Sequence, residues 1–270
     1  MNWPERPGTM LVAGHRGMRY TLPENTMTAF RAAIALGVDM IETDVRMTVD
    51  GQIVLMHDEA VDRTTGESGL VREMSLERFL SLNAACDYED IAPEPPATLD
   101  GLMALCDEHP ELLINFELKD YPTPGLEAFA LESMERTLEA VEAHGMRERC
   151  VINSFSGRLL EAVAERYPGR YRLHGFYPFE AMGEMKRDPR DILYCVCAWP
   201  FRVLPDGRTR PLNYNVPPRE CFEVARKAGL EVWIGPSVRS RAELEACVER
   251  GARMVTTDYP EDALHILREG

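Results

Sequence analysis

Short apolar runs recur along the chain and alternate with segments in which apolar residues repeat at helical spacing. The runs predict β-strands at residues 10–13, 38–45, 112–118, 150–153, 171–176, 192–197, 230–234 and 253–257. Helical patterns follow the strands, at residues 25–36, 98–108, 124–144, 156–167, 179–187, 219–228, 240–250 and 260–268. Eight alternations of strand and helix predict an α/β fold of the (β/α)8 TIM-barrel type, and 270 residues suit one such domain.

One apolar run does not fit this alternation. Residues 53–56 follow the second predicted strand after a turn at Asp50-Gly51, a strong hairpin signal. This link is too short for a parallel crossover, so we expect residues 53–56 to return antiparallel and to carry His57 back over the second strand. The polar, turn-rich segment 58–97 then reads as a small insertion on the face of the site, or equally as a plain surface subdomain.

Acidic side chains follow two of the predicted strands. Glu42 and Asp44 are two residues apart, so in a strand they point to the same face. Neighbouring carboxylates repel each other unless a cation lies between them, and oxygen ligands favour a hard ion such as Mg²⁺ or Ca²⁺. Glu117, at the end of the third barrel strand, can complete this predicted metal site.

Basic and proton-transferring side chains occur at the same strand ends. His15 and His57 are candidates for a general acid and a general base. Arg16 and Lys119 are candidates for binding an anionic group such as phosphate. Asn25 and Thr26 look instead like N-cap residues of the helix that follows them.

Composition narrows the possible partners. The formal net charge of −15 argues against nucleic acid and against stable association with an anionic membrane. No apolar run approaches the roughly 18 residues of a membrane span, and the first residues lack the pattern of a signal peptide. The seven cysteines are scattered without a C-x-x-C pair, which favours a reducing, cytoplasmic location.

These motifs, taken together and in order, resemble those of the glycerophosphodiester phosphodiesterase family. The resemblance rests on His15-Arg16-Gly17, Pro23-Glu24-Asn25-Thr26, Glu42-x-Asp44, His57-Asp58 and Glu117-x-Lys119, with lesser matches at Thr64-Thr65, Ser154-Phe155, Trp233 and Thr257-Asp258-Tyr259-Pro260. One departure is the ending Trp233-Ile-Gly-Pro-Ser237, where the family usually has a Val-Asn-type sequence. The departure concerns the substrate wall near Trp233.

The resemblance implies roles for the individual residues. Glu42, Asp44 and Glu117 would bind one divalent cation, and His15, His57 and Arg16 would be catalytic. Arg16 and Lys119 would hold phosphate. Independently of the resemblance, aromatic rings at or near the predicted strand ends, among them Phe155, Trp199 and Trp233, are expected to contact the leaving alcohol.

The implied activity is metal-dependent hydrolysis of a small glycerophosphodiester to glycerol 3-phosphate and an alcohol. The alternatives are a phospholipase-D-like or lysophospholipid-cleaving relative on the same barrel, and a non-catalytic barrel that binds a phosphate ester. The sequence leaves open the alcohol, the choice between Mg²⁺ and Ca²⁺, which histidine is the acid, attack by water or by a glycerol hydroxyl, and the oligomeric state.

Overall fold

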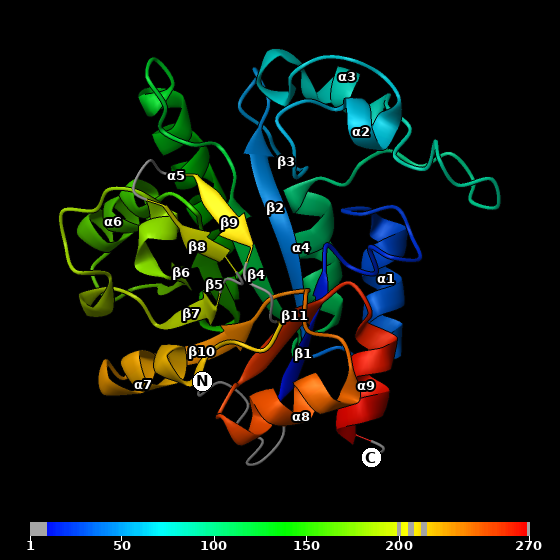
Figure 1. The fold of residues 1–270 in the computed structure, drawn as a ribbon. Helices are drawn as coiled ribbons and strands as arrows, with labels where there is room; N and C mark the ends of the chain where they lie inside the picture. The colour runs from blue at the N-terminus through cyan, green and yellow to red at the C-terminus, as the bar shows by residue number, and fades with distance from the viewer. Residues whose placement is uncertain (1–9, 199–200, 205–207, 212–214, 269–270) are drawn as a thin grey trace.

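A computed structural model describes residues 10–198, 201–204, 208–211 and 215–268. Eight parallel strands form a closed barrel, and β1 pairs with both β2 and β11 to close it (Figure 1). The prediction of a TIM barrel is confirmed. The barrel strands, in hydrogen-bonded order, are β1 (Leu11–His15), β11 (Met254–Thr257), β10 (Glu231–Ile234), β7 (Cys195–Ala198), β6 (Arg172–Tyr177), β5 (Cys150–Asn153), β4 (Leu113–Leu118) and β2 (Met40–Met47).

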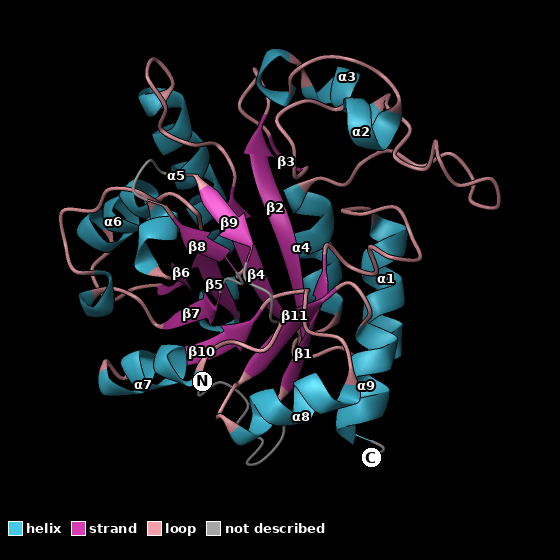
Figure 2. Ribbon diagram, viewed as in Figure 1, coloured by secondary structure: helices cyan, strands magenta, loops and turns pink. Residues whose placement is uncertain are grey.

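Helices cover the outside of the barrel (Figure 2). Hydroxyl side chains begin several of them; Thr26, for example, accepts a hydrogen bond from Ala29 N and so caps α1 as predicted. Ser240 and Glu243 form a full capping box on α8. The main helices are α1 (Met27–Leu36), α4 (Leu99–Glu108), α5 (Glu127–Ala143), α6 (Gly157–Arg166), α7 (Arg219–Lys227), α8 (Arg241–Glu249) and α9 (Pro260–Arg268).

The predicted helix at residues 179–187 is wrong. Only a short 3-10 turn, η3 (Phe179–Met182), forms there, because Gly183 adopts φ 74° and ψ −157°, outside the helical region. A second 3-10 turn, η4 (Pro189–Asp191), precedes β7. Between β7 and α7 lies a small hairpin, β8 (Phe201–Val203) paired antiparallel with β9 (Thr209–Pro211).

The segment after β2 follows the hairpin prediction. β3 (Ile53–Leu55) pairs antiparallel with β2, and Met56 N donates to Asp44 O at 3.0 Å. The chain then forms α2 (Asp62–Thr65), η1 (Val71–Glu73) and α3 (Leu76–Leu80) above the carboxyl end of β2 (Figure 1). These elements pack around a small apolar cluster of their own that includes Val61 and Phe79.

Alternate residues of each barrel strand point into the barrel. The lower interior is apolar and includes Ala13, Met40, Val151 and Trp233. Two residues further along several strands, the inward positions change to polar residues, among them His15, Glu42 and Asn153. The interior is therefore packed with apolar side chains in its lower part and lined by polar side chains at the carboxyl ends of the strands.

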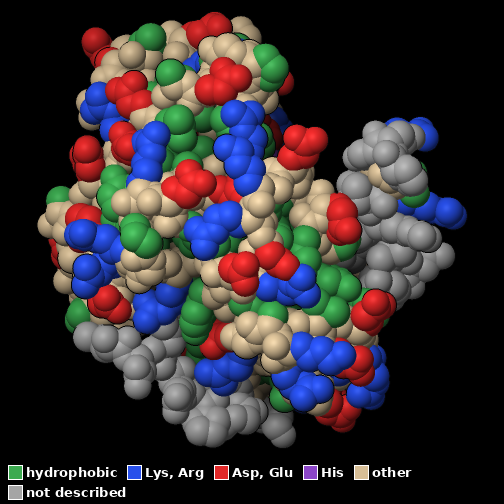
Figure 3. Space-filling view, turned by 90° about the vertical axis from the view of Figure 1, so that its left-hand side faces the viewer, with side chains coloured by type: hydrophobic (Ala, Val, Ile, Leu, Met, Phe, Trp, Pro, Cys, Tyr) green, Lys and Arg blue, Asp and Glu red, His purple; other side chains and the backbone are tan. Residues whose placement is uncertain are grey.

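The surface mixes both signs of charge. Figure 3 shows acidic and basic side chains interspersed over the face on the left-hand side of Figure 1. On α5 and its neighbours they form exposed pairs, such as Arg136 with Glu132 and Arg170 with Glu142. Within the described part of the chain, no helix combines the length and the apolar character required to cross a membrane.

Candidate active site

A cavity of about 260 Å³ lies at the carboxyl ends of the barrel strands. Side chains from all eight strands or the loops that follow them reach it, together with one from the β3 return strand. It is the position at which TIM-barrel enzymes place their active sites. Its lining residues are His15, Arg16, Arg19, Glu42, His57, Asn115, Glu117, Lys119, Asn153, Phe155, His174, Phe176, Cys197, Gly235, Pro236 and Thr256.

Three buried carboxylates meet at this chamber. Glu42, Asp44 and Glu117 each offer an oxygen, and these oxygens lie within 4.8 Å of one another. The strand register explains the meeting, because Asp44 of β2 lies opposite Glu117 of β4. The three side chains that the sequence assigned to one metal site are therefore brought together.

Two cations partly neutralise the carboxylates. Arg16 Nε lies 3.1 Å from Asp44 Oδ2, while Lys119 Nζ lies 2.5 Å from Glu117 Oε1 and 3.3 Å from Asp44 Oδ1. Burial lowers the pKa of Lys119, but the adjacent carboxylates outweigh it and the net pKa is raised. Both cations that were predicted to bind phosphate thus stand beside the acidic cluster.

Glu42 is the carboxylate with the least neutralisation. Its Oε1 is buried and has no hydrogen-bond partner among the described residues. Burial, and then the charges of Asp44 and Glu117, raise the pKa of Glu42 well above its ordinary value. A buried, unpartnered oxygen beside two other carboxylate oxygens fits a hard divalent cation, which would stabilise the ionised form.

Each candidate catalytic histidine has its own aspartate. His15 Nδ1 lies 2.5 Å from Asp258 Oδ1, and His57 Nδ1 lies 2.6 Å from Asp58 Oδ1. The other nitrogen of His15, Nε2, lies 3.7 Å from Glu42 Oε2. A carboxylate at Nδ1 fixes the tautomer and leaves Nε2 available for proton transfer. Desolvation by burial lowers the pKa of both imidazoles, to about 4 for His57.

The loop after β1 is held in a strained conformation that presents Arg16. Arg16 has φ 53° and Gly17 has φ 87°; a Cβ at Gly17 would lie 2.8 Å from the Ala29 carbonyl carbon. Asn25 was predicted as a helix cap, but its side chain instead donates to Asp44 Oδ2 at 3.0 Å and accepts from Thr43 Oγ1. This loop is thus built around the site and not only around α1.

Glu24 connects the loop to the segment after β3. It accepts hydrogen bonds from Arg16 at 2.8 Å and from Arg19 at 3.0 Å. Arg63 of α2 donates to the same carboxylate, at 2.6 Å and 3.0 Å, and also to Asp58. The segment after His57 therefore reaches the rim of the site and contacts the partners of both Arg16 and His57.

A polar floor lies beneath the carboxylates. It consists of Asn115, Asn153 and His174, all buried and all lining the cavity. Asn115 Nδ2 lies 3.1 Å from His174 Nδ1, while Asn115 Oδ1, Asn153 Oδ1 and His174 Nε2 have no partner among the described residues. Burial lowers the pKa of His174 to about 3, so it is neutral and carries its proton on Nε2. The floor thus offers one donor and two acceptors.

Of the aromatic residues predicted to contact the substrate, Phe155 lines the cavity and Trp233 does not. Phe155 lies in the cavity wall and stacks on Phe176, with the two ring centroids 3.5 Å apart. Lys119 Nζ lies 5.8 Å from the centroid of the Phe155 ring. Trp233 does not line the cavity, contrary to the prediction: it points inward one layer too deep, is 1% exposed and lies under His174. Its Nε1 donates to Glu231. Trp199 lies outside the described residues.

The strand position above Trp233 is Gly235, and it lines the cavity together with Pro236. The departure noted in the sequence, Trp233-Ile-Gly-Pro, therefore does face the site, through its glycine and proline and not through its tryptophan. A Cβ at Gly235 would lie 3.5 Å from Cys197 Sγ, an ordinary contact. The absence of a side chain there leaves room on the apolar side of the chamber.

The two-residue period of a strand would have identified two cavity residues that were not predicted, Asn115 and Asn153. Asn115 lies two residues before Glu117, and Asn153 two before Phe155, so each pair shares an inward face. Asp258 was noticed only as part of a motif. No local pattern indicates that it pairs with His15, because 243 residues separate them.

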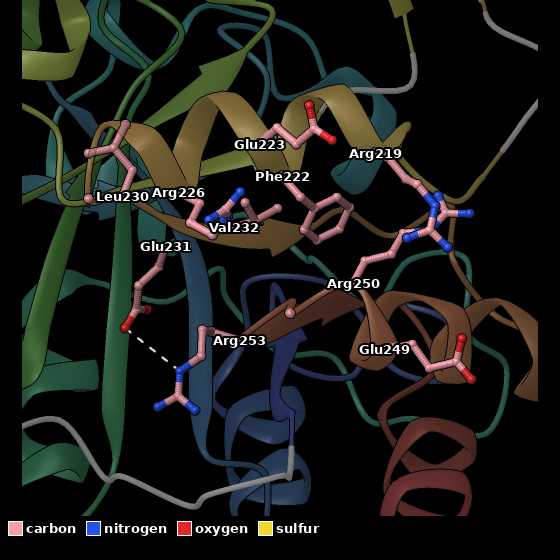
Figure 4. A pocket seen from close by; sticks show the side chains of 12 residues that line it. Arg219, Phe222, Glu223, Arg226, Leu230, Glu231, Val232, Glu249, Arg250 and Arg253 are labelled. Carbon is pink, nitrogen blue, oxygen red and sulfur yellow. Dashed lines mark ion pairs between the residues drawn. The ribbon is translucent and has the colours of Figure 1, made fainter.

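A larger cavity, of about 440 Å³, lies at the opposite, N-terminal end of the strands (Figure 4). One face of α7, the start of β10 and the end of α8 line it. Figure 4 shows arginines and glutamates along its edges, with Arg253 Nε 3.8 Å from Glu231 Oε1. It lacks the converging carboxylates and histidines of the smaller cavity, which is therefore the better candidate for chemistry.

Comparison with known proteins gives a consistent family assignment. The model of the glycerophosphoryl diester phosphodiesterase family matches residues 15–262. A glycerophosphodiester phosphodiesterase of Caldanaerobacter subterraneus subsp. tengcongensis is 30% identical, over 96% of this chain and 98% of the relative. One from Bacillus subtilis is 26% identical over 98% of this chain and 88% of the relative.

Solved structures share the fold. The glycerophosphodiester phosphodiesterase of Agrobacterium tumefaciens superposes with a TM-score of 0.74 at 21% identity, covering 97% of this chain and 100% of that one. An Oleispira antarctica phosphodiesterase in complex with the product sn-glycerol-3-phosphate has a TM-score of 0.76 at 19% identity, covering 96% of both chains.

Proposed function

Since the chain belongs to the glycerophosphoryl diester phosphodiesterase family, we propose that it hydrolyses glycerophosphodiesters to glycerol 3-phosphate and an alcohol with the help of one divalent cation. One observation carries the proposal. Three carboxylates, the two cations Arg16 and Lys119, and two histidine–aspartate pairs converge on one cavity at the carboxyl end of the barrel.

Glu42, Asp44 and Glu117 would hold the cation, Mg²⁺ or Ca²⁺. When bound, such an ion neutralises charge on a phosphate oxygen and lowers the pKa of a coordinated hydroxyl or water. Arg16 and Lys119 flank the carboxylates and would orient the phosphate. One histidine would remove the proton of the nucleophile and the other would protonate the leaving alkoxide.

The two sides of the cavity fit the two ends of such a substrate. A hydroxyl group both donates and accepts, which matches the donor and the two acceptors of the floor formed by Asn115, Asn153 and His174. The glycerol end would therefore point down to the floor. The alcohol would leave along the wall of Phe155 and Pro236. The product complex of the Oleispira antarctica phosphodiesterase supports a ligand of this class.

Replacement of His174 tests the place of the glycerol end. We expect His174→Leu to raise KM for glycerophosphocholine about tenfold, the weight of one lost neutral hydrogen bond. His174→Gln keeps an N–H and is expected to lose less. Neither variant is expected to change KM for bis(p-nitrophenyl) phosphate, which has no glycerol. His109→Leu serves as the control, because His109 is only partly buried and does not line the cavity. Equal losses on both substrates would contradict this placement.

The function itself is tested by turnover of glycerophosphocholine, glycerophosphoethanolamine, lysophosphatidylcholine and phosphatidylcholine, with and without a chelator. Release of glycerol 3-phosphate that stops on chelation and returns with Mg²⁺ or Ca²⁺ is the expected result. Preference for lysophosphatidylcholine would favour the lysophospholipid-cleaving alternative, and release of phosphatidic acid from phosphatidylcholine the phospholipase-D-like one. Binding of glycerol 3-phosphate without turnover of any diester would favour the non-catalytic barrel.

A further inference from the structure

We propose that Arg46, held by Asp120, is a positioning residue that fixes His57 relative to Lys119. Arg46 lies on β2 and does not line the cavity of the site. The inference rests on the proposed function, because it assigns Arg46 a role only through two residues of that site.

The contacts of Arg46 point to both residues. Its Nε and Nη2 donate to the His57 carbonyl oxygen, at 3.2 Å and 2.8 Å. Its Nη1 donates to the Lys119 carbonyl oxygen at 3.2 Å and to Asp120 Oδ1 at 3.2 Å. One planar guanidinium therefore spans the backbone after β3 and the backbone after β4.

Asp120 holds the guanidinium in place. Its Oδ2 accepts from Met47 N at 2.8 Å and from Ser133 Oγ of α5 at 2.7 Å, so β2, the end of β4 and α5 are joined at one carboxylate. Arg46 and Asp120 are 9% and 8% exposed. Buried charge-assisted hydrogen bonds of this kind hold their partners rigidly, and loss of one partner leaves the other charge buried and unpaired.

His57 needs such a support more than His15 does. His15 is part of a barrel strand, between β11 and β2. His57 comes after β3, which pairs with β2 over only three residues and has no barrel strand on its other side. The side-chain partner of His57, Asp58, belongs to the same protruding segment. The two hydrogen bonds from Arg46 connect His57 directly to the barrel.

The expected effect is on the chemical step. Lysine has one charged nitrogen and cannot span both carbonyl groups, so Arg46→Lys frees His57 to move. Misplacement by about 1 Å can cost roughly a hundredfold in rate, and we expect kcat on glycerophosphocholine to fall about tenfold to a hundredfold, with a smaller change in KM. Asp120→Asn and Ser133→Ala are expected to give smaller losses in that order.

The matched control is Arg149→Lys. Like Arg46, Arg149 links backbone carbonyl groups, in this case those of Cys106, His109 and Leu112. It lies at the N-terminal end of the barrel, before β5. This variant is expected to lower Tm and to leave kcat unchanged. Comparison of the two variants distinguishes the general effect of losing an arginine that links carbonyl groups from the specific effect of losing Arg46.

The decisive measurement is a double-mutant cycle with His57→Ala, followed on an activated diester so that slow variants remain measurable. If Arg46 acts through His57, Arg46→Lys costs little more in the His57→Ala background. An equal cost in both backgrounds, or an equal cost from Arg149→Lys, would overturn the proposal. If Arg46→Lys does not fold, Ser133→Ala enters the same cycle. Absence of glycerophosphodiester turnover by the unmodified protein, with aryl diester turnover retained, would reject the proposed function alone.

Discussion

Glu42→Gln is expected to reduce turnover of glycerophosphocholine by about 10²–10³-fold, and to make the metal-free protein more stable. The loss of turnover follows from the metal site, since removal of one group that stabilises charge in the transition state typically costs about 10²–10³-fold. The change keeps the size of the side chain, so no cavity opens. Activity and stability should therefore change in opposite directions.

The gain in stability has an electrostatic cause. Glu42 is buried beside Asp44 and Glu117, and its pKa is raised well above 4.5, so the folded protein binds a proton that the unfolded chain releases. A raised carboxyl pKa contributes stability below the unfolded value of about 4.5, and that contribution is lost as pH rises through the folded pKa. In chelator, the unfolding free energy of the unmodified protein should fall with pH over this range relative to that of Glu42→Gln.

Thermal unfolding with and without cation distinguishes the two effects. Mg²⁺ or Ca²⁺ at 100 times its Kd should stabilise the unmodified protein by about 2.7 kcal/mol and should not stabilise Glu42→Gln. Glu161→Gln is the matched control. Glu161 lies on α6, away from the site, and is also buried, but its carboxylate accepts a hydrogen bond from Arg187 N. Normal turnover by Glu42→Gln in chelating buffer would exclude a metal role for Glu42.

The sequence was sufficient for the barrel because the strands are apolar runs and the helices have their own periodicity, several of them with a capping residue such as Thr26 or Ser240. It also predicted the triad, since Glu42 and Asp44 share a face by strand geometry and Glu117 ends a neighbouring strand. The failure at residues 179–187 has a local cause, the backbone conformation of Gly183, which a helical pattern of apolar residues does not exclude.

Side-chain partners across the barrel were not predictable in the same way. The pairing of His15 with Asp258 depends on closure of the barrel between β1 and β11. The depth of Trp233 depends on the stagger of β10, which places Gly235 and not the tryptophan at the level of the cavity. Asparagine is a common N-cap residue, so the sequence around Asn25 suggests a helix cap. Only the fold shows that Asp44 lies within hydrogen-bonding distance of its side-chain amide.

His15→Ala and His57→Ala are each expected to lower kcat on glycerophosphocholine by about 10²–10⁴-fold, the usual weight of general acid–base catalysis. The structure favours different roles for the two. The His15 side chain is 12% exposed and lies 3.7 Å from Glu42, at the depth where a nucleophile beside the metal would be activated. The His57 side chain is 32% exposed, so it lies closer to solvent than His15 and is better placed to protonate an alcohol that departs into water.

A change of leaving group assigns these roles. Burial lowers the pKa of both imidazoles in the free protein, so His57 can become an acid only beside the negative charge of a bound phosphate, which favours the imidazolium. With glycerol p-nitrophenyl phosphate, whose leaving group needs no proton, we expect His57→Ala to recover most of its lost rate and His15→Ala to stay impaired. His144→Ala is the control, because His144 is also partly exposed but pairs with Asp107 and does not line the cavity. Recovery by His15→Ala instead would exchange the two roles, and recovery by neither variant would show that protonation of the leaving group is not what His57 contributes.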